Sequence, residues 1–96
     1  MSKKAEQAAI KLGEHLATWR KLLNLTADQV AQRADINRGT LRRLEAGQVV
    51  GVDVLLEVSR SLGILDALIN AADPWESDLG RARAGATLPK RVRHHD

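Results

Sequence analysis

The sequence predicts a small all-α protein, and three observations lead to that prediction. Apolar residues recur with helical spacing through the first 73 residues, and no window alternates in the manner of a β-strand. Residues with strong capping preferences stand at the ends of these stretches. The chain has 96 residues, 44% of them hydrophobic and only two aromatic. We therefore expect one small domain with an aliphatic core.

The first predicted helix covers about residues 5–23. Its apolar residues fall on one stripe of a helix, and they are Leu12, Leu16, Trp19 and Leu23. We expect Trp19 to belong to the core for this reason. Asn24 follows as a residue that tolerates the left-handed backbone of a helix end.

Two short helices are expected next, over residues 27–34 and 38–45. Thr26 is a good N-cap residue, and Gln29 completes a capping box with it. Asn37 can cap the following helix. Because only three residues separate the two helices, they must cross steeply. The inner side then consists of apolar residues, namely Val30, Ala34, Ile36, Leu41 and Leu44.

A fourth helix is predicted from Asp53 through Leu62, and a fifth covers 65–72. Gly47 and Gly63 end the helices that precede them. The helical pattern stops at Pro74, so we expect a turn there and a short tail. Within that tail, Leu88-Pro89-Lys90-Arg91-Val92-Arg93 is basic and predicted to be extended.

Charge is unevenly distributed along the chain, although the net charge is only +3. Residues 1–47 carry nine Lys/Arg against five Asp/Glu, and residues 79–96 carry five against one. Residues 48–78 carry one arginine against six acidic residues. This segregation suggests one face for a polyanion and another for a different partner. A set of solvated surface charges is the simpler interpretation, and charge alone does not separate the two.

Several function classes find no support in the sequence. The absence of cysteine excludes disulfides, iron–sulfur clusters and a cysteine nucleophile. There is no phosphate-binding glycine loop, no Ser–His–Asp set and no apolar stretch of membrane-spanning length. His94 and His95 are adjacent and have no further ligands beside them. We therefore expect a cytoplasmic protein that is not an enzyme and uses no cofactor or metal.

The helix over 38–45 carries the clearest chemical signal. Its outward side is expected to present Arg38, Gly39, Arg42 and Arg43, with Asn37 as the cap at its start. An α-helix fits the major groove of DNA, where an arginine can bond to both O6 and N7 of guanine. A solvated arginine face on a helical hairpin explains the same residues, and the pattern alone does not decide between them.

The arrangement of these residues resembles the helix-turn-helix of lambdoid-phage-repressor and Xre-type regulators over roughly residues 12–72. The residues that carry the resemblance are Leu12-Gly13, Arg20-Lys21, Leu25-Thr26, Val30-Ala31, Ala34, Ile36-Asn37-Arg38, Thr40-Leu41, Leu44-Glu45-Ala46-Gly47, Leu55-Leu56 and Leu62-Gly63. The resemblance implies a five-helix, lambda-repressor-like DNA-binding domain with a short extended tail. We place this domain at 12–73, a helical extension at 1–11, and a partner-binding or flexible tail at 74–96.

The resemblance also implies roles for individual residues. The helix over 38–45 would be the recognition helix, with Asn37, Arg38, Gly39, Arg42 and Arg43 facing bases and Arg38 and Arg43 as the main readers. Phosphate contacts are expected from Thr26, Gln29, Arg33 and Thr40, and long-range attraction from Lys3, Lys4, Lys11 and Lys21. Arg20 and Glu45 would form a structural clasp between the first and third helices.

Three positions depart from the family's pattern. Ala27 stands where relatives often have a glutamine that contacts phosphate, and Gly39 stands where they often have a polar reader. Asp35 stands where glycine is usual, in a turn that tends to need a left-handed backbone. These departures leave the fold intact and affect how the domain docks on DNA.

A second resemblance covers the end of the chain. Leu62–Leu68, Asp73–Gly80 and the basic 88–93 stretch resemble HipB-type antitoxins, which are made alongside HipA-like kinase toxins. It implies an autoregulating repressor dimer that also holds a toxin. We expect the dimer or partner surface at Ile64, Leu65, Leu68, Ile69 and Trp75. A stand-alone Xre-type regulator, a protein-only interaction module and a repressor with a small ligand remain as alternatives.

Overall fold

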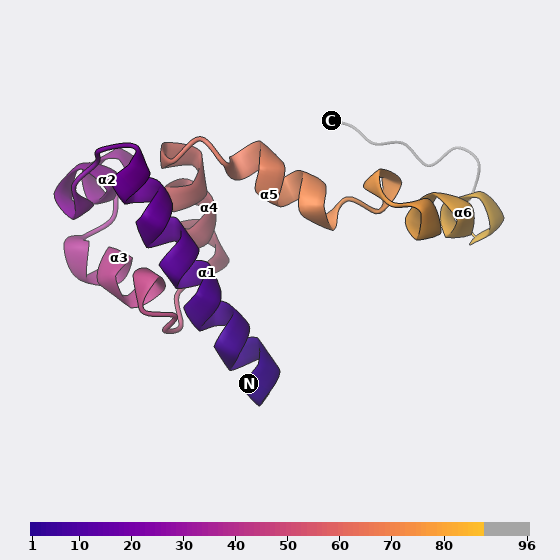
Figure 1. Cartoon of the computed structure of the whole chain (residues 1–96), viewed down its shortest axis with the longest axis horizontal. Coiled ribbons are helices and arrows are strands. Elements are labelled where there is room, and N and C mark those ends of the chain that lie inside the picture. The colour runs from indigo at the N-terminus through magenta and orange to yellow at the C-terminus, as the bar shows by residue number, and fades with distance from the viewer. Residues whose placement is uncertain (88–96) are drawn as a thin grey trace. The chain divides into compact units, whose positions relative to one another are not determined.

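The computed structural model describes residues 1–87, and all regular secondary structure in that range is helical. A first unit covers residues 1–65, and a second unit begins at Asp66. The elements in chain order are α1 (Lys3–Leu22), α2 (Ala27–Ala34), α3 (Arg38–Glu45), α4 (Val52–Ser61), α5 (Leu65–Ala72), the short 3-10 helix η1 (Pro74–Glu76) and α6 (Asp78–Thr87) (Figure 1). The predicted all-α fold class is confirmed.

The first unit has a single aliphatic core between its helices. α2 packs against α3 and α4, and α1 packs against α3 (Figure 1). The buried residues are Leu16, Val30, Ala31, Ala34, Leu41, Leu44, Val58 and Leu62. Ile36 packs against this core as a partly buried side chain. The inner sides predicted for α2 and α3 are therefore the ones that the structure buries.

Helix ends agree closely with the capping residues read from the sequence. α2, α3 and α5 have the predicted bounds. α1 begins at Lys3 rather than Ala5, because the hydroxyl of Ser2 accepts a hydrogen bond from the Ala5 backbone N–H at 3.1 Å. α4 begins at Val52, directly after Gly51. Asn24 has the expected positive φ, at 60°.

The prediction that Trp19 lies in the core is wrong. Its side chain is 43% exposed, whereas Leu16, one turn earlier on the same stripe, is 1% exposed. Leu22 and Leu23 are also exposed. The apolar stripe of α1 therefore continues onto the surface beyond the side chains that the core buries.

The sequence did not predict the helix that follows Pro74 in the part of the tail that the structure describes. Residues 78–87 form α6, and Ser77 caps this helix by accepting a hydrogen bond from the Gly80 N–H at 2.9 Å. Arg81 adds an ion pair with Asp78 and a hydrogen bond to the Trp75 carbonyl. Residues 88–93, predicted to be extended, lie outside the described residues.

Candidate nucleic-acid interface

Reciprocal hydrogen bonds fix the start of α2. The Thr26 hydroxyl accepts from the Gln29 N–H at 3.1 Å, and the Gln29 side-chain oxygen accepts from the Thr26 N–H at 2.8 Å. This is the capping box predicted from the sequence. It satisfies two backbone N–H groups that a helix start otherwise leaves without partners.

The turn between α2 and α3 has a left-handed residue and a capping residue in close succession. Asp35 has φ 57° and ends α2, so an aspartate occupies the left-handed position that was expected in this turn. Asn37 begins α3 by accepting a hydrogen bond from the Thr40 N–H through its side-chain oxygen at 2.8 Å. The two helices are thus joined by a short turn in which both helix ends are capped.

The outward side of α3 carries three exposed arginines, Arg38, Arg42 and Arg43, which we call the arginine face. Gly39 is also exposed, while Leu41 and Leu44 on the opposite side are buried. Within residues 1–87, Arg42 and Arg43 form no ion pair. Their guanidinium groups are therefore available to an anion or a base edge.

Arg38 differs from its two neighbours because it has an acidic partner. Its Nη1 lies 3.2 Å from Oδ1 of Asp28 in the first turn of α2. Both side chains are more than half exposed. Asp28 was not among the predicted site residues, and the one signal for it was an acidic residue in the first turn of the helix before α3.

α1 fixes the position of α3 through a close backbone contact. A Cβ atom on Gly13 would lie 2.5 Å from the carbonyl oxygens of Leu44 and Glu45. Gly47 follows α3 with φ 78°, and a Cβ there would lie 2.6 Å from the Cα of Ile10. The end of α3 therefore rests directly on the α1 backbone, with no room for a side chain at either glycine.

Arg20 and Glu45, the pair implied by the resemblance, form a two-point ion pair. Arg20 Nε lies 2.8 Å from Glu45 Oε2, and Arg20 Nη2 lies 3.1 Å from Glu45 Oε1. Arg20 Nη1 also donates to the Leu25 carbonyl at 3.3 Å. The hydrogen bond to Glu45 raises the pKa of Arg20 above its ordinary value, against the opposing effect of burial. The guanidinium thus links α1, the loop after it and the end of α3.

The predicted phosphate-contacting residues differ in whether their polar groups already form hydrogen bonds within the protein. Thr26 and Gln29 are exposed, and each contributes its oxygen to the capping box. Arg33 is exposed, and its carbonyl accepts a hydrogen bond from Arg60. Thr40 is partly buried. The side-chain oxygen of Asn37 serves as the cap of α3, so its amide N–H₂ is the group left to meet a base.

A family model for a helix-turn-helix domain matches residues 11–72, which is more than half of the chain. The chain belongs to this helix-turn-helix family. A search of curated proteins and a search of solved structures found no significant match. Helix-turn-helix domains are the framework of DNA-binding regulators, in which the second helix of the motif lies in the major groove. α3 is that second helix here.

The residues predicted to form a dimer or partner surface fall in both units. Ile64 and Leu65 are partly buried in the first unit. In the second unit Leu68 is partly buried, Ile69 is 54% exposed and Trp75 is 37% exposed. Neither α5 nor α6 contains a buried residue.

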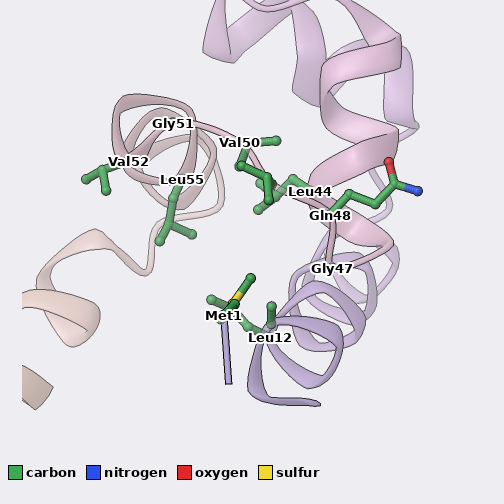
Figure 2. Close-up of a pocket in the computed structure, with 11 residues that line it drawn as sticks. Met1, Leu12, Leu44, Gly47, Gln48, Val50, Gly51, Val52 and Leu55 are labelled. Atoms are coloured by element: carbon green, nitrogen blue, oxygen red, sulfur yellow. The ribbon is translucent and has the colours of Figure 1, made fainter. Parts of the chain in front are cut away.

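A separate apolar groove in the first unit was not predicted from the sequence. Figure 2 shows Met1 and Leu12 of the N-terminal segment on one side and Val50 and Leu55 on the other. Leu44 and Gly47 also line it, whereas none of the residues predicted to face DNA does. No residue that lines the groove has a charged side chain, so the groove does not extend the arginine face.

Two further classes of site can be addressed for residues 1–87. No helix in this range is long and apolar enough to cross a membrane. No cluster of three or more His, Cys, Asp or Glu in the same range could hold a metal ion. His94 and His95 lie outside the described residues.

Proposed function

We propose that this helix-turn-helix protein is a sequence-specific transcriptional repressor that binds an operator as a homodimer. The observation that carries the proposal is the arginine face of α3, held on a helix whose two ends are fixed by a cap and by α1. Arginines on a positioned helix can reach base edges, whereas arginines on a loose segment would bind phosphates without sequence preference.

In this proposal the side chains divide into two roles. Arg38 and Arg43 read guanine through paired hydrogen bonds to O6 and N7, and Asn37, Gly39 and Arg42 complete the base-facing side. Thr26, Gln29, Arg33 and Thr40 contact the phosphates that flank the half-site. The lysines of α1 (Lys3, Lys4, Lys11 and Lys21) add salt-dependent attraction without sequence preference.

Dimerisation is supported by the surface of the second unit. Its helices bury no residue, yet they carry apolar side chains such as Ile69 and Leu79. A second copy that covers Leu68, Ile69 and Trp75 would remove this surface from water. Ile64 and Leu65 of the first unit are the other residues that we expect a second copy to contact. Two recognition helices would then read half-sites about one helical turn apart, near 10 bp.

The antitoxin role is a narrower part of the proposal. It rests on the resemblance of residues 62–80 and 88–93 to HipB-type antitoxins, and on the acidic character of residues 48–78. A reading frame for a HipA-like kinase beside this gene would support it. Without such a neighbour, a stand-alone Xre-type regulator is the better description.

A protein-only interaction module is the second candidate function. Residues 48–78 carry six acidic residues and one arginine, which cannot favour contact with phosphates. A chain that binds no duplex with sequence preference but forms a tight complex through this segment would be such a module.

Alanine variants of the arginine face test the division of roles. Arg38→Ala and Arg43→Ala are each expected to cost about 1–3 kcal/mol on the preferred duplex and to reduce discrimination against others. Arg33→Ala serves as the control, because loss of a phosphate contact should weaken binding to all duplexes alike. Fluorescence anisotropy titrations on preferred and shuffled duplexes measure both effects. If both variants bind the two duplexes as tightly as the parent does, α3 does not contact the DNA bases and the proposed division of roles is wrong.

A further inference from the structure

Arg38 is the one arginine of the arginine face that has an acidic partner among residues 1–87. We propose that Asp28 is a specificity-determining residue, which holds Arg38 toward a guanine and away from phosphate. This inference rests on the proposed function, because it assigns a role inside the same DNA-binding site. Asp28 itself is a positioning residue that acts through Arg38.

The geometry leaves Arg38 able to read a base while it is held. Asp28 Oδ1 engages only Nη1 of the guanidinium, at 3.2 Å. The group carries five N–H donors in a planar fork, so Nε and Nη2 remain for two parallel hydrogen bonds. Paired bonds to O6 and N7 of guanine need two such donors. The contact with Asp28 thus fixes one side of the fork and leaves another side for the base.

Electrostatics then separates the two possible targets of Arg38. A phosphate that approaches the guanidinium also approaches the Asp28 carboxylate, and these two anions repel each other. A guanine edge is neutral and presents acceptors only, so it incurs much less repulsion. The carboxylate therefore weakens phosphate binding by Arg38 more than it weakens guanine binding.

The position of Asp28 suits this role better than a role in stability. The side chains of Arg38 and Asp28 are 57% and 73% exposed, and ion pairs this exposed add little to stability. The carboxylate stands in the first turn of α2, where the helix dipole favours a negative charge. Asp28 therefore lies at the edge of the arginine face, within hydrogen-bond distance of Arg38.

The proposal predicts a change in specificity that a general charge effect would not produce. The preferred duplex is first selected from a pool with random inserts, and a shuffled duplex of the same composition is made from it. Fluorescence anisotropy at physiological salt gives a dissociation constant for each duplex. The measured quantity is the ratio of the constant for the shuffled duplex to the constant for the preferred duplex. Asp28→Asn is expected to tighten binding to the shuffled duplex and to lower the ratio about fivefold.

Asp35→Asn is the matched control. Asp35 is an exposed aspartate of the same motif that forms no ion pair within residues 1–87, and asparagine accepts its left-handed backbone. It removes the same charge without touching Arg38, so it should tighten binding to both duplexes alike and keep the ratio unchanged. Thermal unfolding of each variant verifies that the domain is folded. Asp28→Ala removes the same carboxylate as Asp28→Asn and should lower the ratio in the same direction.

Double variants decide whether Asp28 acts through Arg38. In an Arg38→Ala background, Asp28→Asn should change the ratio by less than about twofold, while its full effect should persist in an Arg43→Ala background. An unchanged ratio in Asp28→Asn, or an equal change in the Arg38→Ala background, would overturn the proposal. A parent protein without any duplex preference would instead contradict the proposed function, and this inference with it.

Discussion

Replacing Gly13 by alanine is expected to destabilise the first unit by about 3 kcal/mol, near the upper end of overpacking effects. The new Cβ would lie 2.5 Å from the carbonyl oxygens of Leu44 and Glu45. Both neighbours are backbone atoms at the end of α3, so they cannot move aside as a flexible side chain could. The helix must shift away from α1, and urea unfolding followed by far-UV circular dichroism would measure the loss.

Gly39→Ala is the control for this variant, because it makes the same chemical change in a helix of the same unit. A Cβ at Gly39 would meet only the side-chain oxygen of Asn37, at 3.3 Å. Alanine also favours a helix more than glycine does, by up to about 1 kcal/mol. We expect a change in stability of less than about 1 kcal/mol. If Gly13→Ala also changes the free energy of unfolding by less than about 1 kcal/mol, the backbones of α1 and α3 do not approach each other as closely as the structure shows.

Removal of Glu45 is expected to have an effect of similar size. Glu45→Ala leaves the Arg20 guanidinium, whose side chain is only 15% exposed, without its carboxylate. Breaking a buried ion pair from one side costs about 3–5 kcal/mol, and the partial exposure of this pair places the expected loss near 3 kcal/mol. That is a large share of the roughly 5–15 kcal/mol that stabilises a small domain.

The pH dependence of this loss follows from the pKa of Arg20, which Glu45 raises in the folded state. A raised pKa contributes stability that is fully present below the unfolded-state value and is lost only as the pH rises through the folded-state value. Both values for arginine lie above the range of ordinary buffers. The difference between parent and Glu45→Ala should therefore be the same at pH 7 and pH 9.

Glu57→Ala provides the comparison, since Glu57 pairs with Arg60 at 2.9 Å on the surface of α4. Both side chains are about half exposed, and we expect a loss below about 0.5 kcal/mol. The double variant Arg20→Met with Glu45→Ala should recover part of the Glu45→Ala loss, because no unpaired buried charge remains. Equal costs for Glu45→Ala and Glu57→Ala would show that the clasp is not a significant stabilising contact.

Local signals explain why the bounds of α2 and α3 could be predicted. The residues that end or begin these helices act within a few positions of themselves, so their effect can be predicted without the tertiary structure. They are the capping box of Thr26 and Gln29, the left-handed Asp35 and the N-cap Asn37. The bounds of α1 and α4 were slightly off because Ser2 and Gly51 cap them earlier than the apolar pattern begins.

Tertiary context explains what the sequence could not supply. Helical spacing placed Trp19 on the apolar stripe, but it could not tell which side chains of that stripe the core buries. α6 has few apolar residues, and it depends on the Ser77 cap and the Arg81 contacts rather than on an amphipathic pattern. The partner of Arg38 lies ten residues earlier in the chain, on another helix.

Binding to two duplexes tests the central claim most directly. The protein would be titrated at physiological salt against the duplex that it selects from a random pool and against a shuffled duplex of equal length. A repressor that reads bases through the arginine face should prefer the selected duplex by at least about 1000-fold. Equal and weak binding to both would leave only charge attraction at work, and it would contradict sequence-specific recognition by α3.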